Sequence, residues 1–495
     1  MFRLCACIVL LTFLTGHVAP AKDAWLYTRT DHFELFSNAT EADARELIED
    51  LEEFRAALLV GMKLPPGREP PTRVVAFRRD KDFDPYKPIF DGKTKELSGY
   101  FTGGSDVAFI AIRLGRDQDE ARRIIFHEYV HQLLVTHGLN PPLWLNEGLA
   151  EFYSTFRMVK GEVVIGTPIE THVTFLNQVR GMGVADLARM GRDSKDYNEG
   201  FRQGLFYARS WALVHYMLCG KSKHDLSRAL PRFLALQNAG DLSEPERFEK
   251  AFGMDYSAMD VELLRYLRGG RFYLYRGELP TKTAAKHFEL TAADPVLLEC
   301  TLTELEWLAR KSGDATYRLL TLQENNPAVA RVPEALGSIA WRKNDLLAAK
   351  DYWQQAAELG SDNPFVLVQG TLGTIHDTMG NGNLNYRFNA GMAAPLRSRL
   401  VRALDLCPDY AEAYEGLALL EAFAAEPEII NVNRVQRNTA KIGDLHYTYL
   451  ALAILRWRMG DFETSRQLVQ VLRAAPGKDR VRLRILAALE SELQK

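Results

Sequence analysis

Two histidines and a glutamate in the first third of the chain are spaced like the ligands and the base of a metal site. They belong to the sequence His127-Glu128-Tyr129-Val130-His131, an H-E-x-x-H pattern. Residues four apart on a helix lie one turn apart on one face, so both imidazoles can bind one Zn²⁺. Glu128 is then placed to take a proton from a water molecule at the metal. The pattern predicts hydrolytic zinc chemistry.

A third protein ligand is expected, because a catalytic zinc commonly has three and keeps its fourth position for water. Glu147 is our candidate. The 15 residues between it and His131 suffice to end one helix, turn and begin another. Gly138 and the Asn-Pro-Pro sequence at 140–142 favour that turn. We expect one Zn²⁺ per chain, bound by His127, His131 and Glu147.

The predicted second helix, residues 144–151, also carries side chains that can support the ligands. Glu147 and Glu151 lie one turn apart on it, so Glu151 can accept the spare ring N–H of a ligand histidine and fix its tautomer. We assign the same supporting role to Asn146. The alternative is that these residues are ordinary surface polar groups. It fits poorly, because Glu128 belongs to a stretch that is apolar around most of the helix and is expected to be buried.

The whole chain has an ordinary globular composition and a leader-like start. Its 495 residues are 47% hydrophobic and 25% charged, with a net charge of −3. Without a long basic run, this gives no argument for nucleic acid or an anionic membrane as a partner. Residues 1–21 resemble a signal peptide with a cleavage site at Ala19-Pro20-Ala21, and their apolar stretch is too short to span a bilayer. We expect export to the periplasm or the exterior without a stable membrane span; an uncleaved anchor is the alternative.

Between the leader and the metal helix, the pattern indicates a mixed α/β subdomain at residues 22–115. Strands are predicted at 32–36, 73–78, 99–101 and 107–112, with a helix at about 40–60. The strand just before the metal helix could hold an extended peptide by main-chain pairing, as an exposed sheet edge does. A plain core strand is the open alternative. The candidates for substrate binding are Val107, Ala108 and Phe109.

Three stretches resemble the gluzincin branch of zinc peptidases, namely HEYVH, WLNEGLAE and YARSWALVHYML. The likeness is to the peptidase MA-like proteins of secreted bacterial type and covers residues 25–218. It implies a zincin-like α+β domain. It also implies that Tyr207 donates a hydrogen bond to the oxyanion of a tetrahedral intermediate, a role that suits a phenol. The alternative donors are His215, His172 and His137.

The sequence departs from gluzincin aminopeptidases in two places. The gap after H-E-x-x-H is shorter than theirs, and Gly103-Gly104-Ser105-Asp106 stands where they have a G-x-M-E-N element that holds the substrate amino terminus. We therefore expect an endopeptidase or a peptidase of narrow specificity. Two other functions stay open: an inactive, peptidase-like scaffold for protein interactions, and a zinc hydrolase of non-peptide amide bonds such as those of cell-wall material.

The C-terminal part is expected to be all-α. Small residues and tryptophans around 335–356, with turns at 343–345, 407–409 and 459–462, fit tetratricopeptide-like repeats. We expect about four to five repeats over 297–493, with a concave surface that binds a peptide or protein partner. A spacer without a partner is the alternative. The predicted fold is an α+β zincin-like domain followed by an all-α tetratricopeptide-like solenoid.

The expected division of the chain has four parts. They are the signal peptide at 1–21, the N-terminal α/β subdomain at 22–115, the helical metal subdomain at 116–280 and the repeats at 281–495.

Overall fold

The computed structural model describes most of the chain after its first residues. The described ranges are 24–64, 69–90, 93–94, 97–115, 118–179, 181–191, 200–236, 242–279, 288–379, 382–442, 446–474 and 479–495. The expected signal peptide lies outside them. Among the described residues, no helix is long and apolar enough to cross a membrane.

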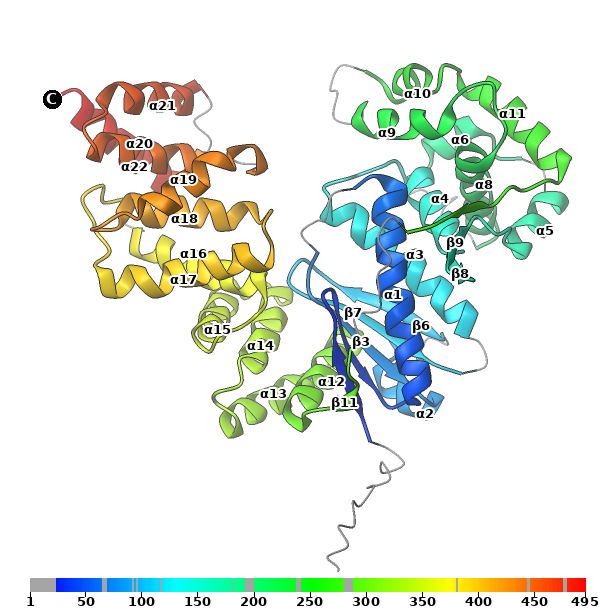
Figure 1. The fold of residues 1–495 in the computed structure, drawn as a ribbon, viewed down its shortest axis with the longest axis horizontal. Helices are drawn as coiled ribbons and strands as arrows, with labels where there is room; N and C mark the ends of the chain where they lie inside the picture. Colours follow the sequence, from blue (N-terminus) through cyan, green and yellow to red (C-terminus); the bar gives the residue numbers. More distant parts are fainter. Residues whose placement is uncertain are drawn as a thin grey trace, which may run out of the picture.

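A six-stranded mixed sheet forms the N-terminal part (Figure 1). Its strand order is β11-β1-β2-β3-β7-β6. The pairs β2–β3 and β3–β7 are parallel, and the other three pairs are antiparallel. The strands predicted from the sequence are present as β2, β3, β6 and β7, whereas β1 and β11 were not predicted. The bounds are β1 (Leu26–Arg29), β2 (Phe33–Ser37), β3 (Thr72–Phe77), β6 (Gly99–Gly103), β7 (Ala108–Arg113) and β11 (Thr291–Ala292).

Helices cover both faces of this sheet, because alternate residues of its central strands point to opposite sides. Val74 and Ile110 share a core with α1 (Glu41–Met62) and α3 (Gln118–Thr136). Val75, Phe77 and Phe109 share a second core with the first helices that follow residue 281. The expected boundary at 280/281 therefore does not separate two hydrophobic cores. The covering helices are α12 (Pro295–Arg310), α13 (Gly313–Asn325) and α14 (Arg331–Arg342).

A helical part stands between the sheet and the C-terminal helices in the sequence. Its centre is α4 (Leu143–Tyr153), which contacts both α3 and α8 (Gly200–Cys219). Gly148 permits this close packing, since a Cβ there would lie 2.5 Å from the carbonyl oxygen of Ser210. A β-hairpin follows α4. The rest of this part consists of further helices and one short strand. The bounds are β8 (Arg157–Val159), β9 (Glu162–Ile165), α5 (Glu170–Gln178), α6 (Val184–Arg189), α9 (Leu226–Leu236), α10 (Glu244–Phe252), α11 (Tyr256–Gly269) and β10 (Tyr275–Gly277), which pairs with β9.

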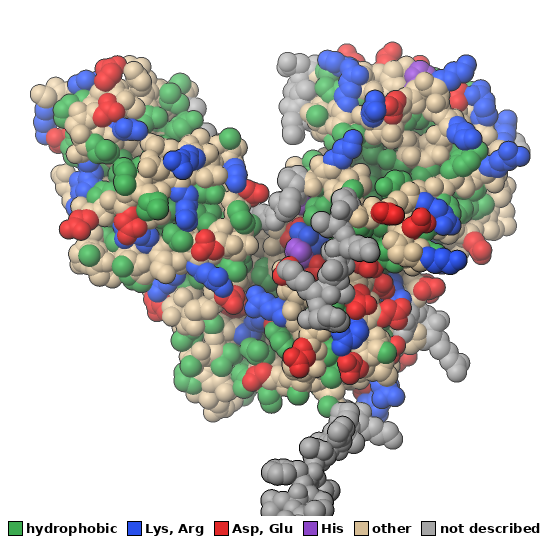
Figure 2. All heavy atoms as spheres, viewed as in Figure 1, with side chains coloured by type: hydrophobic (Ala, Val, Ile, Leu, Met, Phe, Trp, Pro, Cys, Tyr) green, Lys and Arg blue, Asp and Glu red, His purple; other side chains and the backbone are tan. Residues whose placement is uncertain are grey.

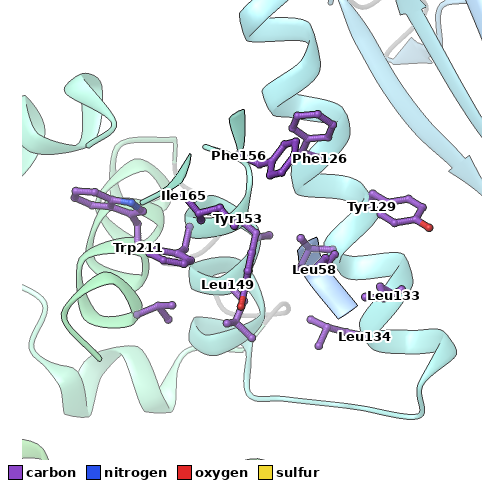
Figure 3. Packing of buried hydrophobic residues seen from close by; sticks show 14 of the residues in the cluster. Leu58, Phe126, Tyr129, Leu133, Leu134, Leu149, Tyr153, Phe156, Ile165 and Trp211 are labelled. Carbon is purple, nitrogen blue, oxygen red and sulfur yellow. The ribbon is translucent and has the colours of Figure 1, made fainter. Parts of the chain in front are cut away.

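The apolar sides of α3, α4 and α8 make one continuous core. Figure 3 shows Phe126 of α3 beside Phe156, with Leu149 and Tyr153 of α4 between α3 and Trp211 of α8. The rings of Phe126 and Phe156 meet edge to face at a centroid distance of 5.7 Å. This packing fixes α3 and α4 relative to each other, and these two helices carry the candidate metal ligands.

The remaining helices stack in chain order beyond α14 (Figure 1). The predicted turns at 343–345 and 407–409 fall between helices, and the turn predicted at 459–462 ends at Phe462, the first residue of the next helix. Small residues stand where neighbouring helices meet: a Cβ on Gly337 of α14 would lie 2.4 Å from the indole of Trp353 on α15. The bounds are α15 (Leu346–Glu358), α16 (Pro364–Met379), α17 (Ala390–Leu406), α18 (Ala411–Phe423), α19 (Ile429–Arg437), α20 (His446–Arg458), α21 (Phe462–Ala474) and α22 (Arg480–Leu493).

Candidate metal centre

The sequence builds the centre by folding two helices back on one another. Helix α3 ends at Thr136, and Gly138 follows with a φ of +65°, the left-handed conformation that ends many helices. Pro142 then precedes the first turn of α4. The helix–turn–helix predicted from the sequence is confirmed. It places His127 and His131 of α3 opposite Glu147 of α4.

Three side-chain atoms form a small triangle at this place. The Nε2 atoms of His127 and His131 lie 3.1 Å apart, and Oε2 of Glu147 lies 3.3 Å from each of them. Zinc binds nitrogen and oxygen ligands at about 2.0–2.2 Å in a tetrahedron, whose ligand–ligand edges are then about 3.3–3.6 Å. The triangle, with edges of 3.1 Å and 3.3 Å, therefore comes close to one face of such a tetrahedron. Within the described part of the chain, one group of His, Cys, Asp and Glu side chains is close enough to hold a metal ion, and it consists of these three.

The surroundings of Glu147 also suit a cation. Its Oε2 atom is buried and makes no hydrogen bond, although the two imidazoles face it. Burial would raise the pKa of Glu147, but His127 and His131 outweigh burial and hold that pKa at about 2. The side chain is therefore a carboxylate at neutral pH. The exposed fractions of the His127 and His131 side chains, 14% and 20%, show that both reach solvent.

The outer nitrogens of both histidines face oxygen acceptors. Nδ1 of His131 donates to the Asn146 side-chain oxygen, and Nδ1 of His127 lies 3.5 Å from Oε1 of Glu151. The other carboxylate oxygen of Glu151 lies 3.3 Å from Nε2 of His172 on α5. Asn146 and Glu151 are thus placed as predicted. His172, considered from the sequence only as an oxyanion donor, lies instead behind Glu151. Its spacing from the motif gave no signal of this contact.

Glu128 and Tyr207 lie close to the triangle. The ring of Tyr207, on α8, has its centroid 6.2 Å from that of His127. Glu128 lines a groove that runs along strand β6. Tyr207 therefore lies beside a candidate ligand, whereas Glu128, the residue after His127 in α3, lies in the groove along β6.

Two of the three alternative oxyanion donors lie away from this centre. His215 is fully buried, with Nε2 donating to the Gly166 carbonyl at 2.8 Å and Nδ1 accepting from the Tyr266 hydroxyl at 2.8 Å. Burial lowers the pKa of His215, so it is a neutral core residue. His137, just beyond α3, uses Nδ1 to bond the Leu133 carbonyl at 2.8 Å.

The expected substrate-binding strand requires a correction. Val107 is buried immediately before β7, Ala108 and Phe109 are buried within it, and β7 pairs with β3 on one side and β6 on the other. A strand with two partners has no free main-chain groups to offer a peptide. Strand β6 is one of the two outer strands of the described sheet, the other being β11, and it lines the groove that contains Glu128. In the described sheet, the edge strand that contacts the metal helix is therefore β6 and not residues 107–112.

Comparison with known proteins adds one similarity. Residues 123–233 match a family model described as a protein of unknown function (DUF1570). Searches of curated proteins and of solved structures found no match. The matched segment is the part of the chain that contains the three candidate ligands, Glu128, their supporting residues and Tyr207.

Proposed function

We propose that this protein is a zinc-dependent peptidase, an endopeptidase that acts after export to the periplasm or the exterior. The ligand triangle of His127, His131 and Glu147 carries the proposal, because its edges are close to those of a tetrahedral zinc site and both histidines reach solvent. When bound, zinc would supply Lewis-acid activation of water and of the scissile carbonyl.

The residues around the triangle have distinct roles in this proposal. Glu128 takes a proton from the attacking water and passes it to the leaving amine. The Tyr207 hydroxyl donates a hydrogen bond to the carbonyl oxygen as negative charge develops on it. Asn146 and Glu151 orient the imidazoles through their outer nitrogens. A purely structural zinc site would have no use for Glu128, which argues against an inactive scaffold.

The placement of β6 favours a peptide as the substrate. A sheet edge presents unpaired N–H and C=O groups in a row, with which an extended peptide can pair. The groove of about 970 Å³ along β6 leads to Glu128. The arrangement of a sheet edge beside the metal helix also supports a zincin-like fold, in keeping with the resemblance of the sequence to gluzincins.

We further propose that the helices after α12 form a tetratricopeptide-like solenoid that binds a peptide or protein partner. Their stacking in chain order, the turns at the expected positions and the contact of Gly337 with Trp353 support this fold. Figure 2 shows the C-terminal helices as a lobe with a hollow between it and the lobe at the upper right.

The experiment is to incubate the zinc-loaded, full-length protein with a denatured protein and, separately, with peptidoglycan. Products are identified by mass spectrometry, and a chelator-treated sample that is later given zinc again is the control. We expect internal cleavage of the denatured protein that disappears with the chelator and returns with zinc. Cleavage of peptidoglycan alone would establish the non-peptide hydrolase instead. Trimming only from the amino terminus would contradict the endopeptidase.

A further inference from the structure

The groove along β6 is built partly by the C-terminal half of the chain. Its base is residues 99–102 of β6 and the turn before them, and one wall is α3 with Ile124 and Glu128. The lining also contains Leu308 and Ala309 of α12, more than 170 positions after the metal helix begins. Helix α12 and the proposed base Glu128 thus line the same groove.

Helix α12 is held firmly in this position. The Arg310 guanidinium donates to the carbonyl oxygens of Lys87, at 3.2 Å, and of Asp84, so it fixes the end of α12 to the segment that also lines the groove. One turn and a half earlier, Glu304 forms a buried ion pair with Arg73 of β3. The wall therefore needs no rearrangement before a ligand binds, which favours selective binding.

Several apolar side chains line the groove, together with the carboxylates of Glu120 and Glu128 on α3. Ile89 is exposed over 47% of its surface although it is a large hydrophobic residue. Asp80 and Arg113, which also line the groove, pair with each other at 3.0 Å and so neutralise one another. An apolar side chain of a ligand would remove this surface from water. The apolar lining residues are Ile89, Leu97, Phe101, Ile124 and Leu308.

We propose that α12 forms the wall of a substrate subsite that selects a bulky apolar side chain near the scissile bond. The inference rests on the proposed peptidase function and deepens it by naming the substrate class. It also gives the C-terminal half a direct part in substrate recognition.

The test measures peptide binding to the zinc-loaded Glu128→Gln protein, in which peptides would not be cut. The probes are fluorescent peptides of glycine and alanine with one varied central residue: Leu, Ser or Glu. We expect the Leu peptide to bind at least about 10-fold more tightly than the Ser and Glu peptides. A second substitution, Ala309→Lys, should remove this advantage and favour the Glu peptide. Ala488→Lys on α22, also half-buried but far along the chain, is the matched control and should change nothing.

Partial unfolding of Ala309→Lys would weaken the binding of every peptide. A gain in affinity for the Glu peptide would therefore report a change in recognition and not a loss of stability. Equal binding of the three peptides, no binding of the Leu peptide, or the same preference with and without Ala309→Lys would overturn the subsite. Hydrolysis by the wild-type protein together with an unchanged preference would refute the subsite and leave the peptidase. A changed preference without hydrolysis by the wild-type protein would refute the peptidase and leave the subsite.

Discussion

The Nε2 atoms of His127 and His131 lie 3.1 Å apart. Both of their outer nitrogens face oxygen acceptors, so each ring presents an acceptor nitrogen toward the other if both are neutral. Two facing lone pairs repel unless a proton or a cation lies between them. Because Glu147 adds a buried carboxylate oxygen at 3.3 Å from both nitrogens, a divalent metal resolves this arrangement well.

The first prediction concerns the carboxylate ligand. Glu147→Gln keeps the shape of the side chain and removes its charge, so zinc affinity should fall by more than the roughly 10- to 100-fold typical of losing a supporting residue. Competition with a chelator of known affinity measures this. His137→Ala is the control, since His137 bonds the Leu133 carbonyl rather than the centre. Equal affinities of Glu147→Gln and wild type would remove Glu147 from the ligand set.

Asn146 offers a test of ligand orientation. Asn146→Ala removes the acceptor for Nδ1 of His131, and zinc affinity should fall about 10- to 100-fold while the stoichiometry stays at one. Asn146→Asp keeps an oxygen at this position and should retain most of the affinity. If the Ala and Asp variants bind zinc alike, the hydrogen bond does not support the ligand.

Tyr207→Phe should affect the chemical step and leave the metal in place. Loss of one oxyanion donor typically lowers kcat about 100- to 1000-fold, and we expect that loss with little change in KM or zinc content. Tyr216→Phe, on the same helix, is the control. The Tyr216 hydroxyl lies 3.5 Å from Glu262 on α11. An unchanged kcat in Tyr207→Phe would assign the oxyanion to other groups.

Glu34 links the sheet to the C-terminal helices and should make stability depend on acid pH. Burial raises its pKa, but Arg331 at 2.8 Å, together with Arg73, outweighs burial and holds the pKa at about 2. A carboxyl group whose pKa is lower in the folded than in the unfolded protein stabilises the fold at every pH above its unfolded pKa, which is about 4.3. This stabilisation is lost as the pH falls from about 4.3 toward 2.

Glu34→Gln should therefore lower the free energy of unfolding by about 3 kcal/mol at pH 7 and flatten its decline between pH 4 and 2. Urea unfolding across that range measures both effects. Glu41→Gln, in an exposed pair with Arg45 at 3.0 Å, is the control and should cost under about 0.5 kcal/mol. Similar losses in the two variants would show that burial of the pair is unimportant.

Local pattern was enough to predict the helix–turn–helix of the metal centre. His127, His131 and Glu147 are close because helical periodicity and one Gly-Pro turn bring them together, and these features can be seen within 25 residues of sequence. The four predicted strands of the N-terminal part are also present, because buried strands have continuous apolar runs.

Features that depend on long-range pairing were missed. The β7 residues Ala108 and Phe109 seemed suited to an edge because they precede the metal helix, but strand order is not written in local sequence. Strand β7 pairs with β3 on one side and with β6 on the other, so β6 and not β7 lies at the edge of the sheet. Likewise, no local signal showed that α12 would cover the sheet or that His172 would meet Glu151. In both cases, the segments that meet are distant in the sequence or carry an ordinary helical pattern of apolar residues, which does not indicate what the helix packs against.

The most direct test of the proposed mechanism combines metal content and activity in Glu128→Gln. This substitution keeps the size of the side chain and the three ligands but removes the proton acceptor. We predict one zinc per chain in both proteins, internal cleavage of a denatured protein by the wild type, and a loss of at least about 100-fold in kcat for the variant. Full activity in zinc-loaded Glu128→Gln, or a wild-type protein that binds no zinc when zinc is supplied, would contradict the account.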